Sequence, residues 1–190
     1  MGLAGAAVLV AAVAKTHPQG RFRAAWRSLD AWRTRCPPKQ APAMPLELAM
    51  AVVGWLTING RPRIGAAVLL AYSGLLRASE ALQLTWSDLI WSKLGLTLRL
   101  GQTKRGQEQR VVLTNPSVLH WMRRFYARCS GLSSDRVVGC GYGTLLRWLR
   151  KATAALGWAD VPWTTHSLRR GGASELVLAG MPISDLLEFG

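Results

Sequence analysis

The most informative stretch of the 190-residue sequence is Thr165–Gly172 (THSLRRGG), near its C-terminal end. Thr165 is a suitable N-cap for a helix that begins there. Helical spacing then places His166 and Arg169 on one face, with Leu168 turned toward the core. Cationic side chains beside the free N–H groups of a helix N-terminus form a good site for a phosphate group. The alternative is a surface helix whose basic residues are solvated.

The net charge predicts a polyanionic partner. The sequence has 24 Lys and Arg against 10 Asp and Glu, a formal net charge of +14. Most of the basic residues are arginines, whose planar guanidinium group binds phosphate bidentately. The excess is concentrated between Gly101 and Lys151, so this segment is expected to face the partner.

Length and composition predict one main domain with a hydrophobic core, since 49% of the residues are hydrophobic. Cys36, Cys129 and Cys140 form no C-x-x-C pair, which favours reduced intracellular thiols over a disulfide framework or a zinc site. The apolar run Met1–Ala14 has no basic n-region and is shorter than the roughly 20 residues that span a bilayer. It is therefore predicted to be a buried helix, and no membrane partner is expected.

The N-terminal part is predicted to be separate from the main domain. In Gly20–Arg35, arginines alternate with aromatic and apolar residues, which predicts an amphipathic helix with a basic face that either touches DNA or is solvated. Cys36–Pro45 carries four prolines and reads as a linker. The predicted organisation is a helical stub (1–35), a Pro-rich linker (36–45) and a main domain (46–190).

The main domain is predicted to be helical with one β-hairpin. Apolar periodicity predicts helices over Leu46–Thr57, Ile64–Tyr72, Ser117–Cys129, Thr144–Leu156 and within Met181–Gly190. The alternating segments Leu94–Leu100 and Gln109–Leu113 predict a hairpin with Lys104 and Arg105 near its tip. A lysine there either serves solubility alone or reaches into a groove as a proton donor.

Arg77 and Glu80 lie one helical turn apart in an otherwise apolar neighbourhood. The arginine is either ion-paired to Glu80 for structural reasons or held by Glu80 so that its guanidinium points at a ligand. Three basic elements thus follow one another along the chain. They are Arg77 with Glu80, Lys104 on the hairpin, and His166 with Arg169 on the late helix.

This order of elements resembles the tyrosine recombinase (phage-integrase-like) family. Ser73–Asp88 (SGLLRASEALQLTWSD) matches the first arginine box, Thr103–Lys104 matches the hairpin lysine, and His166–Arg170 (HSLRR) matches the second box. Order and spacing agree over roughly Pro45–Gly190. The resemblance implies the DNA breaking-and-rejoining (integrase-like catalytic) fold, which is mainly α with a small antiparallel β-sheet or hairpin (α+β). It also implies that residues 1–35 are the tail of a DNA-clamping helical domain.

The resemblance assigns catalytic roles to Arg77, Lys104, His166 and Arg169. The two arginines would clamp the scissile phosphate with help from His166, Lys104 would be the general acid, and Glu80 would orient Arg77. These residue types suit the chemistry, because phosphodiester cleavage needs cationic donors around the phosphate oxygens and a proton for the leaving 5′-oxygen. No metal or other cofactor is expected, since no Asp/Glu cluster suited to Mg²⁺ lies near these residues. Further candidates for contacts with the DNA backbone are Arg105, Arg147, Arg150, Lys151 and Arg170.

One part of the family pattern has no match in the chain. In the family, the second box is followed by a third box and then by a Tyr nucleophile on a following helix. The tyrosines here, Tyr72, Tyr126 and Tyr142, all lie upstream, and Tyr72 is predicted to be core. The chain is therefore expected to be truncated before its nucleophile and inactive in strand exchange by itself.

The predicted function is DNA integration or site-specific recombination on duplex DNA through a metal-free 3′-phosphotyrosyl mechanism, as in mobile elements, together with other recombinase protomers. One alternative is a non-catalytic DNA-binding remnant or regulator of such elements. A second is a type IB topoisomerase-like enzyme, against which the sequence around Arg77 and Glu80 argues. A third is a basic RNA-binding protein, for which the sequence has no aromatic-platform motif. The expected location is intracellular, in the nucleus of a eukaryote or the cytoplasm and nucleoid of a bacterium.

Overall fold

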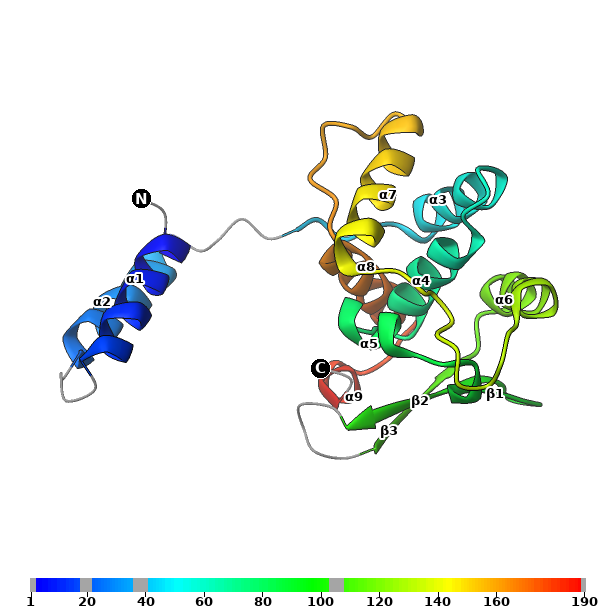
Figure 1. Ribbon diagram of the computed structural model, residues 1–190, viewed down its shortest axis with the longest axis horizontal. Coiled ribbons are helices and arrows are strands. Elements are labelled where there is room, and N and C mark those ends of the chain that lie inside the picture. The colour runs from blue at the N-terminus through cyan, green and yellow to red at the C-terminus, as the bar shows by residue number, and fades with distance from the viewer. Residues whose placement is uncertain (1–2, 18–21, 36–40, 103–107, 189–190) are drawn as a thin grey trace. The chain divides into compact units, whose positions relative to one another are not determined.

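The computed structural model describes residues 3–17, 22–35, 41–102 and 108–188. The chain divides into two compact units, residues 1–40 and 41–190, which Figure 1 draws with their helices and strands labelled. Within the described ranges, no helix has both the length and the apolar character needed to cross a membrane.

The first unit contains two helices that pack against each other, α1 (Leu3–Thr16) and α2 (Arg23–Arg35). The amphipathic helix is confirmed, with Leu29 as its buried residue. The prediction that the apolar run is a buried helix is wrong for much of its surface, because Val8 is 69% and Leu9 53% exposed. A single partner helix covers only one side of α1, so its remaining apolar residues face outward.

The second unit combines helices with a three-stranded sheet, as the predicted fold class requires. Its helices are α3 (Leu46–Ile58), α4 (Pro62–Ser73), α5 (Ala78–Gln83), α6 (Pro116–Cys129), α7 (Tyr142–Ala155), α8 (Thr165–Leu178) and α9 (Ile183–Glu188). A short 3₁₀ turn, η1 (Trp86–Asp88), leads into the strands β1 (Leu89–Ser92), β2 (Gly95–Gln102) and β3 (Glu108–Leu113). The predicted helices are therefore present, with ends that differ by at most two residues.

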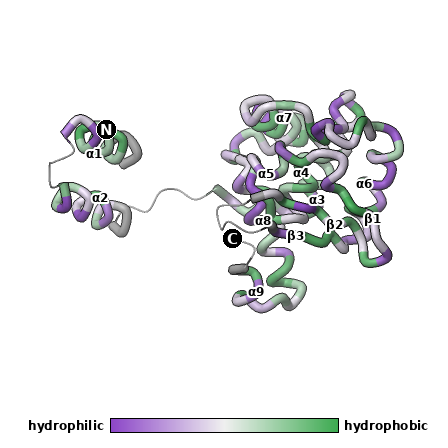
Figure 2. Tube along the Cα trace, turned by 60° about the horizontal axis from the view of Figure 1, so that its bottom comes forward, coloured by the Kyte–Doolittle hydropathy of each residue, from purple (hydrophilic) through white to green (hydrophobic). Residues whose placement is uncertain are grey.

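Helix α4 is the centre of the second unit. Every residue from Ile64 to Tyr72 is buried, and a helix that is apolar on all sides has to be covered on all sides. It packs against α3, α5, α6, α7 and α8. Pro62 starts it, where a missing backbone N–H costs nothing. In Figure 2 the tube of α4 is accordingly coloured as hydrophobic over much of its length.

The sheet is antiparallel, with the strand order β1-β2-β3. Leu98 of β2 pairs with Leu89 of β1 and with Val111 of β3, and all three are buried. Arg99, the next residue of β2, lies opposite Arg110 on the other face. This alternation is what one buried and one open sheet face require. In Figure 1 the sheet lies along one side of the helices of this unit.

Two glycines bring α8 into close contact with the end of α4. A methyl group on Gly172 would overlap the carbonyl oxygen of Tyr72, and one on Gly171 would overlap that of Met44. The Met44 N–H also donates to the carbonyl of Ser167 at 3.0 Å. Met44 is fully buried, so the packed unit begins before Pro45, where the sequence-based linker ends.

We expect Gly172→Ala to lower the free energy of unfolding by about 1–3 kcal/mol, because the backbone of Tyr72 cannot move away without displacing the buried α4. Urea unfolding followed by circular dichroism measures the change. Gly143→Ala in α7 is the matched control, since nothing lies within 4 Å of the added carbon. That change should be neutral or stabilising by up to about 1 kcal/mol. Equal losses for both variants would contradict the close approach.

Candidate functional site

Arg77 is fixed at the start of α5 by Glu80. One carboxylate oxygen of Glu80 accepts from the Arg77 backbone N–H at 2.7 Å, and the other accepts from the Arg77 Nη1 at 2.8 Å. The Arg77 side chain is 36% exposed and that of Glu80 19% exposed. The carboxylate thus holds both the main chain and the guanidinium of Arg77, while part of that guanidinium still reaches solvent.

The turn before Arg77 contains a left-handed backbone conformation, which residues other than glycine rarely adopt. Leu75 has a φ of 50°, yet its side chain is buried. Its Cδ2 lies within 3 Å of the position where a Cβ on Gly172 would sit. Left-handed backbone costs a residue with a Cβ roughly 1–2 kcal/mol. The packing between α4, α5 and α8 therefore maintains this turn against its local preference.

The second basic pair lies in the first turn of α8. The N-cap is Thr164, so the prediction of a Thr165 cap is off by one residue. The backbone N–H of Thr164 donates to the Ser167 hydroxyl oxygen at 3.1 Å. Leu168 is fully buried as predicted.

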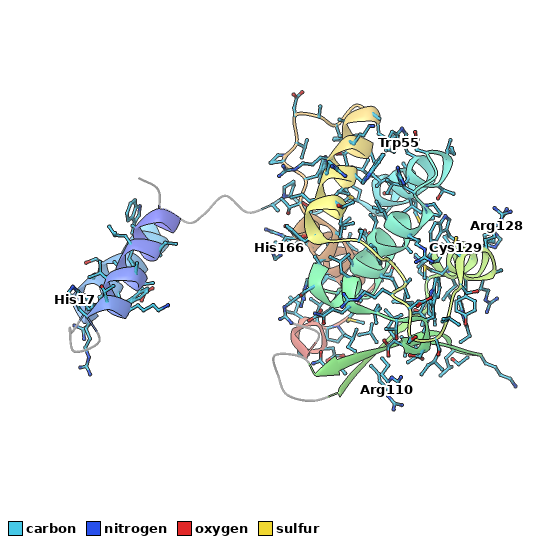
Figure 3. All side chains as sticks on the ribbon, viewed as in Figure 1. His17, Trp55, Arg110, Arg128, Cys129 and His166 are labelled. Atoms are coloured by element: carbon cyan, nitrogen blue, oxygen red, sulfur yellow. The ribbon has the colours of Figure 1, made fainter. Side chains whose placement is uncertain are left out.

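His166 and Arg169 differ in burial, although they share this turn. His166 is exposed and Arg169 is half-buried. Figure 3 shows His166 at the side of the unit opposite to Arg128 and Cys129 of α6.

The charges of Arg77 and Glu80 both act on the guanidinium of Arg169. Burial lowers the pKa of the Arg169 guanidinium, the positive charge of Arg77 lowers it further, and the carboxylate of Glu80 raises it. The guanidinium groups of Arg77 and Arg169 therefore act on each other, and the carboxylate of Glu80 acts on both. A site with this balance favours a bound anion, because an added negative charge relieves the remaining repulsion.

The base of the hairpin lies beside Glu80. Glu80 and Leu100 of β2 both line a pocket of about 210 Å³, which Arg110 of β3 also lines. On the other side, Glu80 and Gly101 line a pocket of about 230 Å³ with Asp88 and Arg99. The described ends of β2 and β3 that face the hairpin tip therefore lie next to the Arg77–Glu80 pair. Lys104 and Arg105 at its predicted tip lie outside the described residues.

The predicted backbone contacts on helices are exposed. Arg147, Arg150 and Lys151 project from α7, and Arg170 follows Arg169 on α8. The Lys151 Nζ lies 4.9 Å from the centre of the Trp148 ring, and the guanidinium carbon of Arg61 lies at the same distance. Their roles stay predictions.

The three tyrosines occupy different environments. Tyr72 is 2% exposed, and burial raises its pKa, with further increases from Glu175 and Glu47. Tyr126 packs edge-on against Trp86 and Trp91. Tyr142 is exposed at the first position of α7. The prediction that Tyr72 is a core residue is confirmed.

Sequence reasoning missed three features that shape this site. Ser167 caps α8, Gly171 and Gly172 allow its close approach, and Asp88 binds Arg99 at 3.3 Å beside Glu80. Of these features, only the glycine pair could have been found from the sequence, because two adjacent glycines inside a helical pattern indicate close packing. Among the described side chains, no group of three or more His, Cys, Asp or Glu is placed to hold a metal ion.

Comparisons with known proteins show the family of the chain and proteins of similar fold. The family described as "Phage integrase family" matches residues 59–190. Among solved structures, the chain is similar to the XerH site-specific recombinase bound to palindromic difH substrate in a post-cleavage complex, with a TM-score of 0.57, 15% identity and coverage of 73% of this chain and 42% of that chain. It is also similar to the XerA recombinase, with a TM-score of 0.59, 18% identity and coverage of 80% and 56%.

These similarities confirm the predicted fold, which is that of tyrosine recombinase catalytic domains. The chain spans about half the length of these recombinases. The comparison with curated proteins gave no match.

We expect Glu80→Gln to lower the free energy of unfolding by about 1 kcal/mol at low salt, because the carboxylate that binds Arg77 and whose charge acts favourably on Arg169 is lost. Added sulfate should recover more of this loss than chloride at equal ionic strength, since a divalent anion can bind both guanidinium groups. Thermal unfolding in the two salts measures the effect. Glu175→Gln on α8 removes the same charge away from this pair and should show no such sulfate dependence.

Proposed function

Because the chain belongs to the phage integrase family, we propose that its second unit is the DNA-binding and phosphate-activating domain of a site-specific recombinase. The observation that carries the proposal is that Glu80 holds Arg77 at the start of α5 by two hydrogen bonds, near enough to Arg169 of α8 for the charges of both residues to act on it. The family similarity alone would allow other uses of the fold. A paired guanidinium site is what the chemistry of a scissile phosphate needs.

In the proposed reaction, Arg77 and Arg169 bind the two non-bridging oxygens of one phosphodiester. Charge accumulates on these oxygens as a tyrosine oxygen attacks the phosphorus, and pre-placed cations stabilise that charge. Glu80 limits the motion of Arg77, so less reorganisation is needed during the reaction. His166, exposed in the same turn as Arg169, assists as a further hydrogen-bond donor to the phosphate.

We assign the general acid to Lys104. The bond between phosphorus and the 5′-oxygen breaks as the tyrosyl–phosphorus bond forms, and the leaving oxygen takes the proton of the lysine. The support comes from the described end of β2, where Leu100 and Gly101 line pockets together with Glu80, the residue that holds Arg77.

We propose that none of the three tyrosines of this chain is the nucleophile. Tyr72 is buried and its raised pKa disfavours the phenolate. Tyr126 is packed between aromatic rings, and Tyr142 lies at the start of α7. The 190-residue chain by itself would then bind DNA without forming a phosphotyrosyl bond, and the reaction would use a tyrosine that is not among these three.

The proposed partner is double-stranded DNA, with other recombinase protomers on the same DNA. The similar XerH site-specific recombinase is bound to its difH substrate in both a pre-cleavage and a post-cleavage complex. The net charge of +14 and the exposed Arg147, Arg150, Lys151 and Arg170 support backbone contacts here. A second candidate function, a non-catalytic DNA-binding protein, is favoured by the environments of the three tyrosines.

We expect duplex DNA binding to weaken steeply with salt, and Arg169→Gln to reduce the slope of log K against log salt by about 1, since one phosphate contact is lost. Fluorescence anisotropy with a labelled duplex measures both. Arg123→Gln is the matched control, because its guanidinium lies over Trp91 of the sheet, 5.4 Å from the ring centre. An unchanged slope for Arg169→Gln would remove this residue from the phosphate site.

Cleavage distinguishes the two candidate functions. A version of the chain that includes a tyrosine nucleophile should form a covalent complex with DNA that resists denaturing electrophoresis, and Arg169→Gln should abolish it. Duplex binding without any covalent complex would favour the non-catalytic protein. Relaxation of supercoiled DNA without site preference would instead favour a topoisomerase-like activity.

A further inference from the structure

Helix α6 presents a row of basic side chains that the proposed reaction does not use. His120, Arg124 and Arg128 follow one another at intervals of four residues, so they lie on one face of the helix. All three are exposed. Successive positions in such a row are about 6 Å apart along the helix axis. The row therefore offers several separate contacts to an extended anion.

Two stacked aromatic rings lie beside this row. The rings of Trp121 and Phe125 have centres 5.2 Å apart and an interplanar angle of 13°. Phe125 is buried, while Trp121 is partly exposed and also rests against Gly65 of α4. Phe125 thus supports one face of the Trp121 ring, which is the more exposed of the two.

These two features line one pocket of about 430 Å³ between α6 and the turn that joins α3 to α4. Gly60 and Pro62 form its opposite wall. The volume falls in the range of roughly 300–1,000 Å³ that is usual for ligand sites. Among the described residues that line it there are two arginines and one histidine but no Asp or Glu, so its charge favours an anion.

We propose that this pocket binds a nucleotide whose base is not stacked in a duplex. The base would stack on Trp121, and the neighbouring phosphates would bind Arg124 and Arg128. Arginine forks bind phosphate bidentately, and an aromatic ring accepts any base because every base has a flat face. A paired base inside a duplex cannot enter such a pocket, so the ligand is a free nucleotide or a nucleotide of a single strand.

This binding site is separate from the Arg77–Arg169 site. No residue is shared between the two, and Figure 3 shows Arg128 and His166 on opposite sides of the second unit. A recombinase domain with such a pocket would hold an unpaired strand while its other face holds a duplex. The inference goes beyond the proposed function and does not require the cleavage chemistry to be correct.

The test is a calorimetric titration of the full chain with deoxyadenosine 3′,5′-bisphosphate, which carries one base and two phosphates. The same sugar bisphosphate without a base is the reference probe. We expect the base to raise the affinity by about 5- to 150-fold, the range of base–aromatic stacking. Equal affinity for the two probes would overturn the proposal.

Charge variants on α6 test the orientation of the ligand. Arg124→Gln and Arg128→Gln should each weaken binding of the bisphosphate by about 5-fold or more. Arg123→Gln changes the net charge equally on the same helix, but its side chain packs over Trp91 outside the pocket, and it should bind as the wild type does. Equal effects of all three variants would show that the binding depends only on the net charge, which would contradict the proposal.

Cysteine protection gives a second readout that does not depend on any substitution. Cys129 lines the pocket and carries a free thiol, whereas Cys140 is free but outside it. Bound deoxyadenosine 3′,5′-bisphosphate should slow alkylation of Cys129 and not of Cys140, as measured by mass spectrometry. Protection by an acidic amphipathic peptide and not by the nucleotide would make the pocket a peptide site and overturn the proposal. Arg169→Gln should leave the protection of Cys129 unchanged, because Arg169 belongs to the proposed duplex site. The nucleotide pocket can therefore be tested even if the proposed duplex site is wrong.

Discussion

The second unit depends on the contact between the Gly171–Gly172 pair of α8 and the backbone at Met44 and Tyr72. Two helices approach this closely only where no Cβ separates them. The contact fixes the distance between the end of α4 and the first turn of α8. Since Arg77 follows α4 by a short turn and Arg169 precedes the glycines by two positions, the same contact sets how near the two guanidinium groups come.

That proximity has an electrostatic cost that the fold does not remove. Like charges oppose each other across the site, and Glu80 offsets part of this repulsion by binding Arg77 through both its backbone and its side chain. Like charges held near each other are more typical of a binding site than of a stabilising network. The fold would be more stable with a second carboxylate beside the two arginines, or with uncharged residues in place of all these charges.

Most of the fold could be predicted from local patterns. The helices and the hairpin follow from apolar periodicity, and the Arg77–Glu80 pair follows from residues one helical turn apart. The coupling of Arg77 to Arg169 could not be derived from spacing, because it depends on how α4 and α8 pack. The burial of α1 was predicted wrongly for the same reason, since periodicity does not say how much of a helix its partners cover. The α6 pocket likewise forms only when the α3–α4 turn packs beside the basic row.

Leu75 has a consequence for sequence variation at the turn before Arg77. Its backbone, with a φ of 50°, suits Gly or Asn, but its buried position suits a large aliphatic side chain. β-Branched residues satisfy the burial but are the least tolerant of this backbone. Residue 75 therefore has few acceptable replacements, because its backbone and its burial favour different residue types.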